Sequence, residues 1–497
     1  MKLNGRVSQH DKYQIEVKFV CPLDRERKIN DYHIDVFFFL PRHLGINRHS
    51  YSRDQFYTDL TEYIRLKTPE VEISELIHED SAIFKRLADV FESYRKGETD
   101  AAEECTRQLK MFCSVTKVAF RDGAARILEQ NRKKRIETIP DYLAHVDTVM
   151  ENYRKMRSSL PENDARFLQE LFDLVDEFLG VTANTYKKLL WKSLTPEKRG
   201  TEQPVIDLIR ESVLREIAYR KGRGYPSVPE PGADNAELLY RESAIKKTMA
   251  SVLYLKVAVR EAGVLLENIF LSVAAAVAMI FVTGIAFLWR GLFLEEFSLS
   301  FFIVWVVAYM FKDRIKALLQ KWFSSHKASY SFDYNQKIYD SMGKKVGLCR
   351  EGVMFRSEKD MDPEICEIRN RSSLSRHVNG PLSEEILTFR KRIELYTKPC
   401  EDIYRVFRVD GVNDIIRFNV REWLRKMDNP VRQMFYPAED GSLGVLKAKR
   451  LYHVNMLIRY GGNGRPDECM RFRLVLARNG IKDVEYVSHK VLGENEP

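Results

Sequence analysis

The chain has 497 residues, of which 30% are charged, and its formal net charge is +9. A chain of this length is too long to form a single small hydrophobic core, so we predict two or three domains. The basic residues form no dense Arg/Lys block with interleaved aromatic residues, which argues against a nucleic-acid partner. The seven cysteines are scattered and form no C-x-x-C pair. This argues against a disulfide framework, a zinc ribbon and a redox motif.

Strand patterns open the chain. Residues 13–19 alternate apolar and polar side chains, which is the period of a half-buried strand. Residues 32–40 repeat the alternation, with Phe37 and Phe39 adding bulk on the second face. We therefore predict a β-hairpin whose second strand is covered on both sides. The first residues have no apolar core of the signal-peptide type, so we expect the N-terminus to stay in the cytosol.

Helical patterns follow. Between residues 51 and 222, apolar side chains recur three and four positions apart, which predicts a bundle of five or six amphipathic helices. Residues 223–234 contain three prolines and two glycines and are expected to form a linker. No helix breaker occurs from residue 235 until Gly263, so we predict a stalk helix over residues 235–268.

Two apolar runs stand in the middle of the chain. Residues 269–289 carry no charge and match the about 20 residues that a helix needs to cross a bilayer. Residues 297–311 form a shorter run, which could be a tilted or re-entrant segment instead. Lys and Arg residues flank both outer ends, which predicts that both termini are cytoplasmic. The alternative for the first run is a core helix of a large soluble protein.

The last third of the chain is predicted to be rich in strands. Residues 312–330 read as a basic amphipathic helix beside the membrane. Residues 452–460 and 470–476 alternate apolar and polar side chains, and Asn479-Gly480 is a hairpin signal. The N-terminal hairpin and this C-terminal meander are each too small to be stable alone. We expect them to join one β body, with the bundle and the apolar hairpin inserted between them.

The predicted fold class is an α+β membrane protein. In it, a cytosolic helical bundle and antiparallel β domains surround a two-helix transmembrane hairpin. The expected organisation is a β-hairpin region at 1–50, a bundle at 51–222, a linker at 223–234, a stalk at 235–268, a transmembrane hairpin at 269–311, a juxtamembrane helix at 312–330 and a cytosolic β-rich domain at 331–497. The short loops and the lack of a sorting signal suggest a bacterial inner membrane, with the lipid bilayer as one partner.

No catalytic motif is found. The glycine-rich segment 461–465 could be mistaken for a phosphate loop, but a strand pattern follows it where a helix is needed. His78, Glu79 and Asp80 lack the H-E-x-x-H spacing, and the G-x-S-x-G elbow is absent. We therefore predict no catalytic residue, no metal ligand and no cofactor.

Three groups of residues are candidates for binding. Small residues of the first apolar run would let transmembrane helices approach closely; they are Ser272, Ala274, Ala276, Ala278 and Gly284. These small residues could serve self-association between two chains, or packing of the two spans within one chain, and the sequence favours neither over the other. Glu295 and Glu296 could line a pore mouth in an oligomer, or simply cap a loop. One face of two predicted strands is basic and carries His453, Arg459, Arg471 and Arg473. This face could simply be solvated, or it could be a docking surface for an acidic or phosphorylated partner.

These patterns favour a non-enzymatic function. The favoured hypothesis is a membrane-anchored cytosolic scaffold that associates with itself. One alternative is an oligomer that forms a pore. The other is a membrane-tethered sensor or enzyme that acts on a nucleotide or a phosphorylated ligand.

Overall fold

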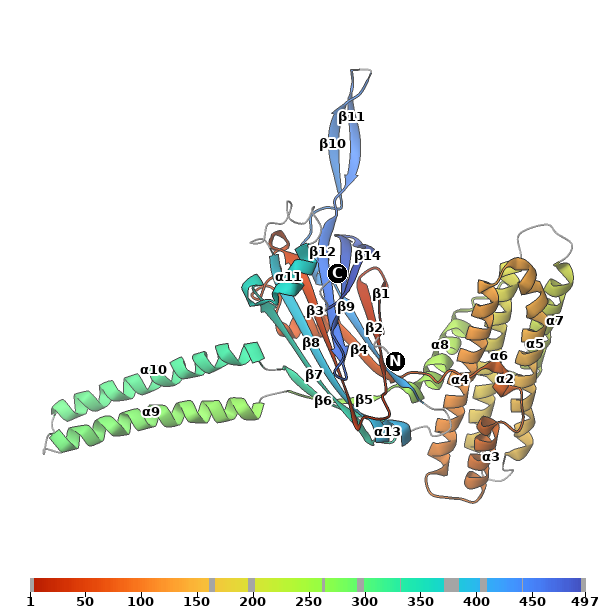
Figure 1. Ribbon diagram of the computed structural model, residues 1–497, viewed down its shortest axis with the longest axis horizontal. Helices are drawn as coiled ribbons and strands as arrows, with labels where there is room; N and C mark the ends of the chain where they lie inside the picture. Colours follow the sequence, from red (N-terminus) through yellow and green to blue (C-terminus); the bar gives the residue numbers. More distant parts are fainter. Residues whose placement is uncertain are drawn as a thin grey trace.

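A computed structural model of the chain gives a central β body, a helical bundle on one side of it and two projecting hairpins (Figure 1). The structure describes residues 4–160, 166–194, 202–261, 264–292, 299–330, 332–370, 384–402, 409–439 and 441–492. Helices and antiparallel strands are both present, so the α+β content predicted from the sequence is confirmed.

Two antiparallel sheets pack face to face in the β body. One has the strand order β1-β2-β9-β4, and the other has the order β14-β13-β12-β3-β8-β7-β6-β5. The strands are β1 Asn4–Gln9, β2 Gln14–Pro22, β3 Ile29–Pro41, β4 Leu60–Leu66, β5 Lys256–Glu261, β6 Tyr334–Tyr339, β7 Lys345–Arg356, β8 Glu384–Tyr396, β9 Gly411–Asn419, β12 Tyr452–Gly462, β13 Glu468–Ala477 and β14 Gly480–Val491. The rings of Phe38, Phe389 and Phe418 meet between the sheets, with centroids 5.0 and 5.9 Å apart. N-terminal and C-terminal strands therefore share both sheets, as the sequence suggests.

The predicted N-terminal hairpin is wrong in its pairing. β2 pairs with β1 and β9, whereas β3 pairs with β12 and β8. The segment between β2 and β3 crosses from one sheet to the other. Asn30 stabilises this crossing, because its side-chain amide donates hydrogen bonds to the Asp24 carbonyl at 3.1 Å and the Thr397 hydroxyl at 2.8 Å.

β3 is covered on both faces, as predicted. Ile34, Val36 and Phe38 face the other sheet, while Phe37 and Phe39 pack under α11 (Pro363–Asn370). A strand that is covered on both faces has apolar side chains at successive positions instead of alternating apolar and polar ones. This explains the continuous apolar run along the second half of β3.

The helical bundle is inserted between β4 and β5. Its helices are α2 Ile73–Leu76, α3 Ala82–Arg95, α4 Ala101–Glu129, α5 Arg132–Lys155, α6 Arg166–Leu194, α7 Gln203–Gly222 and α8 Ala236–Ala250. The rings of Phe112, Tyr153 and Phe172 stack through its centre, with centroids 5.4 and 4.3 Å apart. Shorter helices elsewhere are α1 Arg53–Asp59, α13 Thr397–Asp402 and α14 Arg421–Arg425, with the 3-10 turns η1 Arg42–Leu44, η2 Met156–Ser159, η3 Ser251–Leu253 and η4 Glu358–Asp360.

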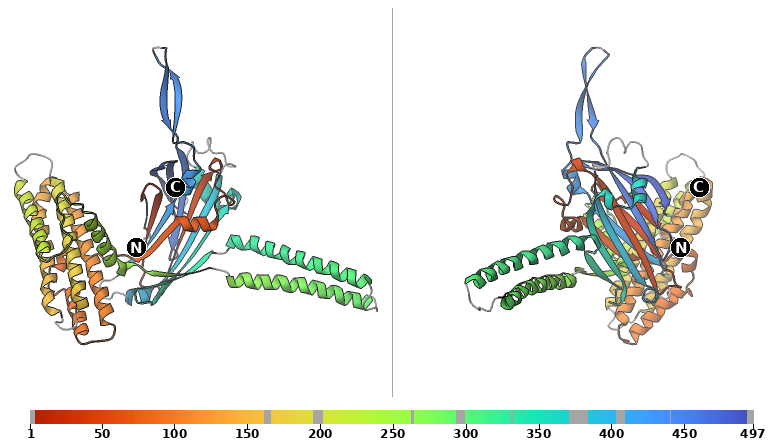
Figure 2. Two further views of the ribbon diagram at one scale, coloured as in Figure 1. Left: turned by 180° about the vertical axis from the view of Figure 1, so that it is seen from behind. Right: turned by 60° about the vertical axis from the view of Figure 1, so that its left-hand side comes forward.

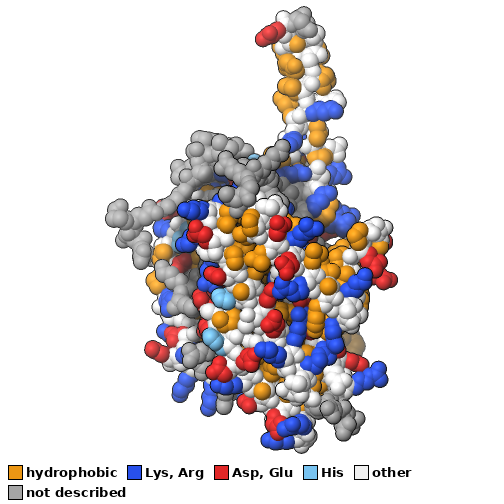
Figure 3. All heavy atoms as spheres, turned by 90° about the vertical axis from the view of Figure 1, so that its right-hand side faces the viewer, with side chains coloured by type: hydrophobic (Ala, Val, Ile, Leu, Met, Phe, Trp, Pro, Cys, Tyr) orange, Lys and Arg blue, Asp and Glu red, His pale blue; other side chains and the backbone are white. Residues whose placement is uncertain are grey.

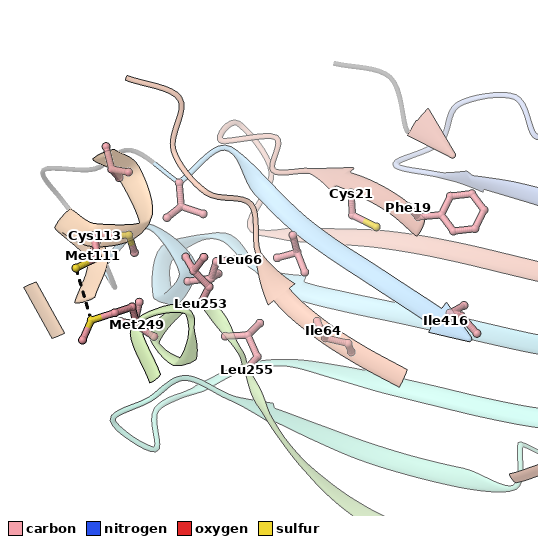
Figure 4. Close-up of a cluster of buried hydrophobic side chains, with 14 of the residues drawn as sticks. Phe19, Cys21, Ile64, Leu66, Met111, Cys113, Met249, Leu253, Leu255 and Ile416 are labelled. Carbon is pink, nitrogen blue, oxygen red and sulfur yellow. Dashed lines mark hydrogen bonds between the residues drawn. The ribbon is translucent and has the colours of Figure 1, made fainter. Parts of the chain in front are cut away.

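The bundle joins the β body through a packed joint. Figure 4 shows Leu253 and Leu255, which follow α8, lying beside Leu66 at the end of β4. Met249 reaches back into the bundle, where its sulfur lies 3.5 Å from that of Cys113. The backbone amide of Leu255 also donates to the carbonyl of Ile64 at 3.0 Å. The core of the bundle and that of the β body are therefore continuous.

Two helical expectations from the sequence are corrected. Residues 60–66 form the strand β4, not a helix, because they pair with β9. Residues 235–268 do not form one stalk helix, since α8 ends at Ala250 and β5 adds to the edge of the larger sheet beside β6. Pairing with a neighbouring strand decides both segments, and such pairing is not visible in a local pattern.

Two long antiparallel helices project from the β body on the side away from the bundle (Figures 1 and 2). We call α9 (Val264–Leu292) and α10 (Leu299–Tyr330) the helical arm. The predicted juxtamembrane helix at 312–330 is the second half of α10, not a separate element. Glu295 and Glu296, the candidate pore-mouth residues, lie outside the described residues.

The predicted transmembrane hairpin is corrected. Within the described residues, no helix has both the length and the apolar character that a membrane span requires. In α10, the charged residues Lys312, Asp313, Arg314 and Lys316 end the apolar run. The prediction of a two-span membrane protein is therefore wrong. This correction includes the predicted cytoplasmic termini and the predicted bacterial inner-membrane location.

Candidate interaction surfaces

The two helices of the helical arm contact each other through small side chains. Ala274 and Ala278 are completely buried, and Val282 and Ala308 are nearly so. Positions four residues apart lie on one face of a helix, and small side chains there let two helices pack closely. The predicted Ala274/Ala278 pair therefore serves packing within this chain.

The other predicted small residues lie on uncovered parts of α9. Ser272, Ala276 and Gly284 are exposed, and a Cβ atom added to Gly284 would meet no heavy atom within 4 Å. The structure therefore separates the predicted set into a pair inside the arm and three residues on its surface.

Large apolar side chains surround the helical arm. The exposed ones are Ile269, Leu271, Val273, Val277, Met279, Ile280, Phe281, Phe287 and Leu288 on α9, and Phe302, Ile303, Trp305, Val306, Val307, Tyr309, Met310, Phe311 and Leu318 on α10. A helix that is apolar on all sides is normally buried. Contiguous exposed apolar surface of this kind marks an interaction site.

A β ribbon projects from the top of the β body (Figure 1). It pairs β10 (Val431–Pro437) with β11 (Leu443–Lys449) in antiparallel register, and within the described part of the chain it forms no ladder with either sheet. Every residue of β10 is exposed. An isolated two-stranded hairpin is at best marginally stable in water, so this element also favours a partner.

The β ribbon is apolar toward its tip and basic toward its base. Phe435 lies opposite Val445 on one face, and Met434 lies opposite Leu446 on the other. Arg432, Lys447 and Lys449 are nearer the base. Figure 3 shows apolar side chains along the ribbon, whereas acidic and basic side chains are mixed over the face of the body. We missed this element in the sequence, although two short stretches rich in apolar residues flank Asp440-Gly441 there.

The predicted basic docking face is largely neutralised within the chain. Arg459 lies 2.7 Å from Asp35, and Arg473 lies 3.3 Å from Glu485. Arg471 is buried, and its guanidinium donates to the carbonyl of Ile368 and to the Asn455 side chain, each at 2.9 Å. Burial, and then the nearby Arg473 and Arg369, lower the pKa of Arg471 to about 10.

His453 belongs to the same face. Burial, and then the charge of Arg473, lower its pKa. The structure thus brings the four predicted residues onto neighbouring strands, but it places Arg471 where a partner does not reach it. Docking of an acidic or phosphorylated partner on this face remains a prediction.

A buried cluster of charges lies between the two sheets. Lys391 on β8 is surrounded by Asp414 at 2.9 Å, Glu62 at 3.0 Å and Glu351 at 3.2 Å. Lys391, Asp414 and Glu351 are at most 1% exposed. The Gln336 side chain donates to Glu351 at 2.8 Å. Three carboxyl groups thus share one cation.

The pKa values of this cluster shift in opposite directions. Burial, and then repulsion by Glu351, raise the pKa of Glu62 well above its ordinary value. Burial also raises the pKa of Asp414, although Lys391 opposes this shift. Burial opposes ionisation of Glu351 as well, but Lys391 outweighs it and the pKa falls. The cluster therefore retains protons above the usual pH range of carboxyl groups.

Sequence patterns could have revealed this cluster. Leu387, Phe389, Ile393 and Leu395 share the inward face of β8, and Lys391 occupies the gap in that alternation. Asp414 interrupts Val412 and Ile416 in the same way. A charge at an inward position of a strand indicates a buried ion pair or a site.

Known proteins give no guide to the function of this chain. No family model, no curated protein and no solved structure matches it. Among the described residues, no group of three or more His, Cys, Asp or Glu side chains could hold a metal ion. None of the seven cysteines, all of which lie in the described part of the chain, forms a disulfide.

Proposed function

We propose that this chain is a self-associating interaction protein and that the helical arm forms the contact between copies. The observation that carries the proposal is the exposed apolar side chains around α9 and α10, among them Ile280 at 71% and Phe302 at 64% exposure. Water disfavours such a surface by about 25 cal/mol for each Å² of apolar area. Covering it against another chain therefore supplies a large driving force for association.

A second copy of the chain is the occupant that fits best. Each copy carries the same surface, so a two-fold axis would bring identical arms together. Two hairpins packed side by side make a four-helix bundle, which is a stable arrangement for amphipathic or apolar helices. Ala276 and Gly284 on the outer side of α9 leave room for a helix of the partner to approach.

The experiment is the mass of the purified protein in solution, measured by light scattering after size exclusion. We expect a discrete multiple of the 58.2 kDa chain. The double variant Ile280→Glu with Val306→Glu places charges on the arm surface and should give the monomer. Leu214→Glu is the control, because Leu214 is 52% exposed on the helical bundle and should leave the mass unchanged.

Two results would contradict the proposal. One is a wild-type protein that runs as a monomer at all concentrations. The other is flotation of the wild type, but not of the double variant, with phosphatidylcholine vesicles, because the arm would then be covered by lipid instead of by a second copy.

A further inference from the structure

A cavity of about 330 Å³ opens at the joint between the helical bundle and the β body. Three separate segments form its walls: the first half of α4, the stretch from η3 to β5, and the turn between β6 and β7. The lining residues are Glu103, Glu104, Thr106, Arg107, Lys110, Ser251, Val252, Tyr254, Lys256, Ser341 and Met342. This volume is at the lower end of the range for small-molecule sites, which occur preferentially between domains.

Positive charge predominates in the cavity. Arg107 and Lys110 come from α4, and Lys256 comes from β5. Of the two acidic side chains, Glu104 is already engaged, because it lies 2.7 Å from Arg86 and accepts a hydrogen bond from Gln108 at 2.8 Å. Glu104 also forms an ion pair with Arg107, so the carboxylate of Glu103 is left to face two cations, Lys110 and Lys256.

Lys110 and Lys256 carry charges that the described part of the chain does not neutralise. No carboxylate of the described residues forms an ion pair with either ammonium group, and the Lys110 ammonium donates to the Ser251 hydroxyl at 3.2 Å. Burial lowers the pKa of Lys110. An anion placed beside these two groups would restore the electrostatic compensation that the protein lacks there.

The remaining lining residues suit a small phosphorylated molecule. The hydroxyl groups of Tyr254 and Ser341 can donate hydrogen bonds to phosphate oxygens. Val252 and Met342 supply an apolar wall, and the ring of Tyr254 is 40% exposed. The cavity thus combines cations, hydroxyl donors and an apolar side, as a site for a phosphate group with an organic substituent would.

We propose that this cavity binds a small phosphate-bearing molecule and that Lys110 and Lys256 hold its phosphate. Because the walls come from the bundle, from β5 and from the β6–β7 turn, the ligand ties the bundle to the β body. β5 leads directly toward α9, so an occupied cavity also fixes the base of the helical arm. This binding does not depend on the proposed self-association.

The test is calorimetric titration of the full chain with two probes, inorganic pyrophosphate and adenosine monophosphate. We expect at least one probe to bind at a single site. Lys110→Gln and Lys256→Gln should each weaken binding about tenfold or more, because each removes a charged hydrogen-bonding group. Lys117→Gln is the matched control, since Lys117 is a half-buried lysine on the same helix that does not line the cavity.

Lack of binding by both probes would overturn the proposal. An equal loss of affinity in the Lys117→Gln control would do the same, because it would indicate a general electrostatic effect. Lys256 is exposed, so its replacement keeps the test valid even if Lys110→Gln fails to fold.

Discussion

At the scale of single residues, the cluster around Lys391 is the feature with the largest consequences. Two sheets close over one lysine and three carboxyl groups, and the second oxygen of Asp414 has no hydrogen-bond partner among the described residues. Removing ions from water costs several kcal/mol each, so such a cluster depends on its geometry and on the protons it retains.

The pH dependence of stability should reflect Glu62. Its folded pKa is raised, so the folded state binds a proton that the unfolded state releases above pH about 4.3. The free energy of unfolding should therefore fall as the pH rises from there through the raised pKa. Asp414, whose folded pKa is also raised, contributes to this fall with the same sign. Glu351 acts only at lower pH and Lys391 only at higher pH, because their folded pKa values are lowered and raised, respectively.

Glu62→Gln should reduce this slope and leave the part that Asp414 contributes. Denaturant unfolding at several values between pH 5 and 8 would measure the slope. Glu16→Gln is the control, since Glu16 lies on the same sheet and pairs with Arg417 at 2.7 Å. An unchanged slope in Glu62→Gln would assign the retained proton to another group.

Loss of Lys391, the cation that the three carboxyl groups share, should destabilise the folded protein. Lys391→Met leaves the half-buried Glu62 and the buried Glu351 and Asp414 without a positive charge and should lower the free energy of unfolding by about 3–5 kcal/mol at pH 7. Adding Glu351→Gln should recover part of this loss, because it removes the carboxyl group whose pKa is lowered. A double variant as unstable as the single one would show that packing, not charge, dominates at this position.

At the scale of elements, the β ribbon contributes little to the stability of the chain in the structure described. Most of its side chains point into solvent on both faces, so they bury little apolar area. Its apolar tip instead favours a role in contacts between molecules.

Phe435→Ser with Leu443→Ser tests that role. These side chains are 63% and 70% exposed, so thermal unfolding should shift by no more than about 0.5 kcal/mol in free energy. Self-association, measured by sedimentation, should weaken if the ribbon adds to the contact made by the helical arm. Tyr486→Ser on β14, at a side chain 62% exposed, should change neither quantity. Unchanged sedimentation of the double variant would leave the arm as the contact and exclude the ribbon.

At the scale of the whole molecule, the bundle is an insertion whose two connections pass through one joint. The leucines shown in Figure 4 pack between the bundle and the β body. Such a continuous core couples the two parts, and we expect them to unfold together.

Leu253→Ala should break this coupling. Leu253 is 3% exposed, and truncation of a buried leucine costs about 2–5 kcal/mol. Calorimetry should show one transition for the wild type and two for the variant, as the bundle and the β body separate. Leu214→Ala, at an exposed position of the bundle, should retain one transition. Two transitions already in the wild type would contradict the coupling.

The sequence by itself determined the type of most elements. Periods of two and of 3.6 depend only on local side-chain directions, so the bundle, the strands β12 and β13 and the two helices of the arm could be recognised. The Asn479-Gly480 turn predicted the pairing of β13 with β14, because such a turn joins adjacent strands. In the candidate surfaces, Ala274 and Ala278 could be singled out from their spacing alone.

Only the tertiary structure decided which segments pair and which charges are buried. β4 and β5 exist because distant strands supply their hydrogen bonds, and β2 and β3 separate for the same reason. Lys391 lies inside because two sheets close over it, and the charges of Arg459 and Arg473 are neutralised by residues distant in sequence or on a neighbouring strand. Strand pairing and the burial of charges depend on residues that are distant in the sequence. A single sequence indicates them only where a charged residue interrupts an apolar face.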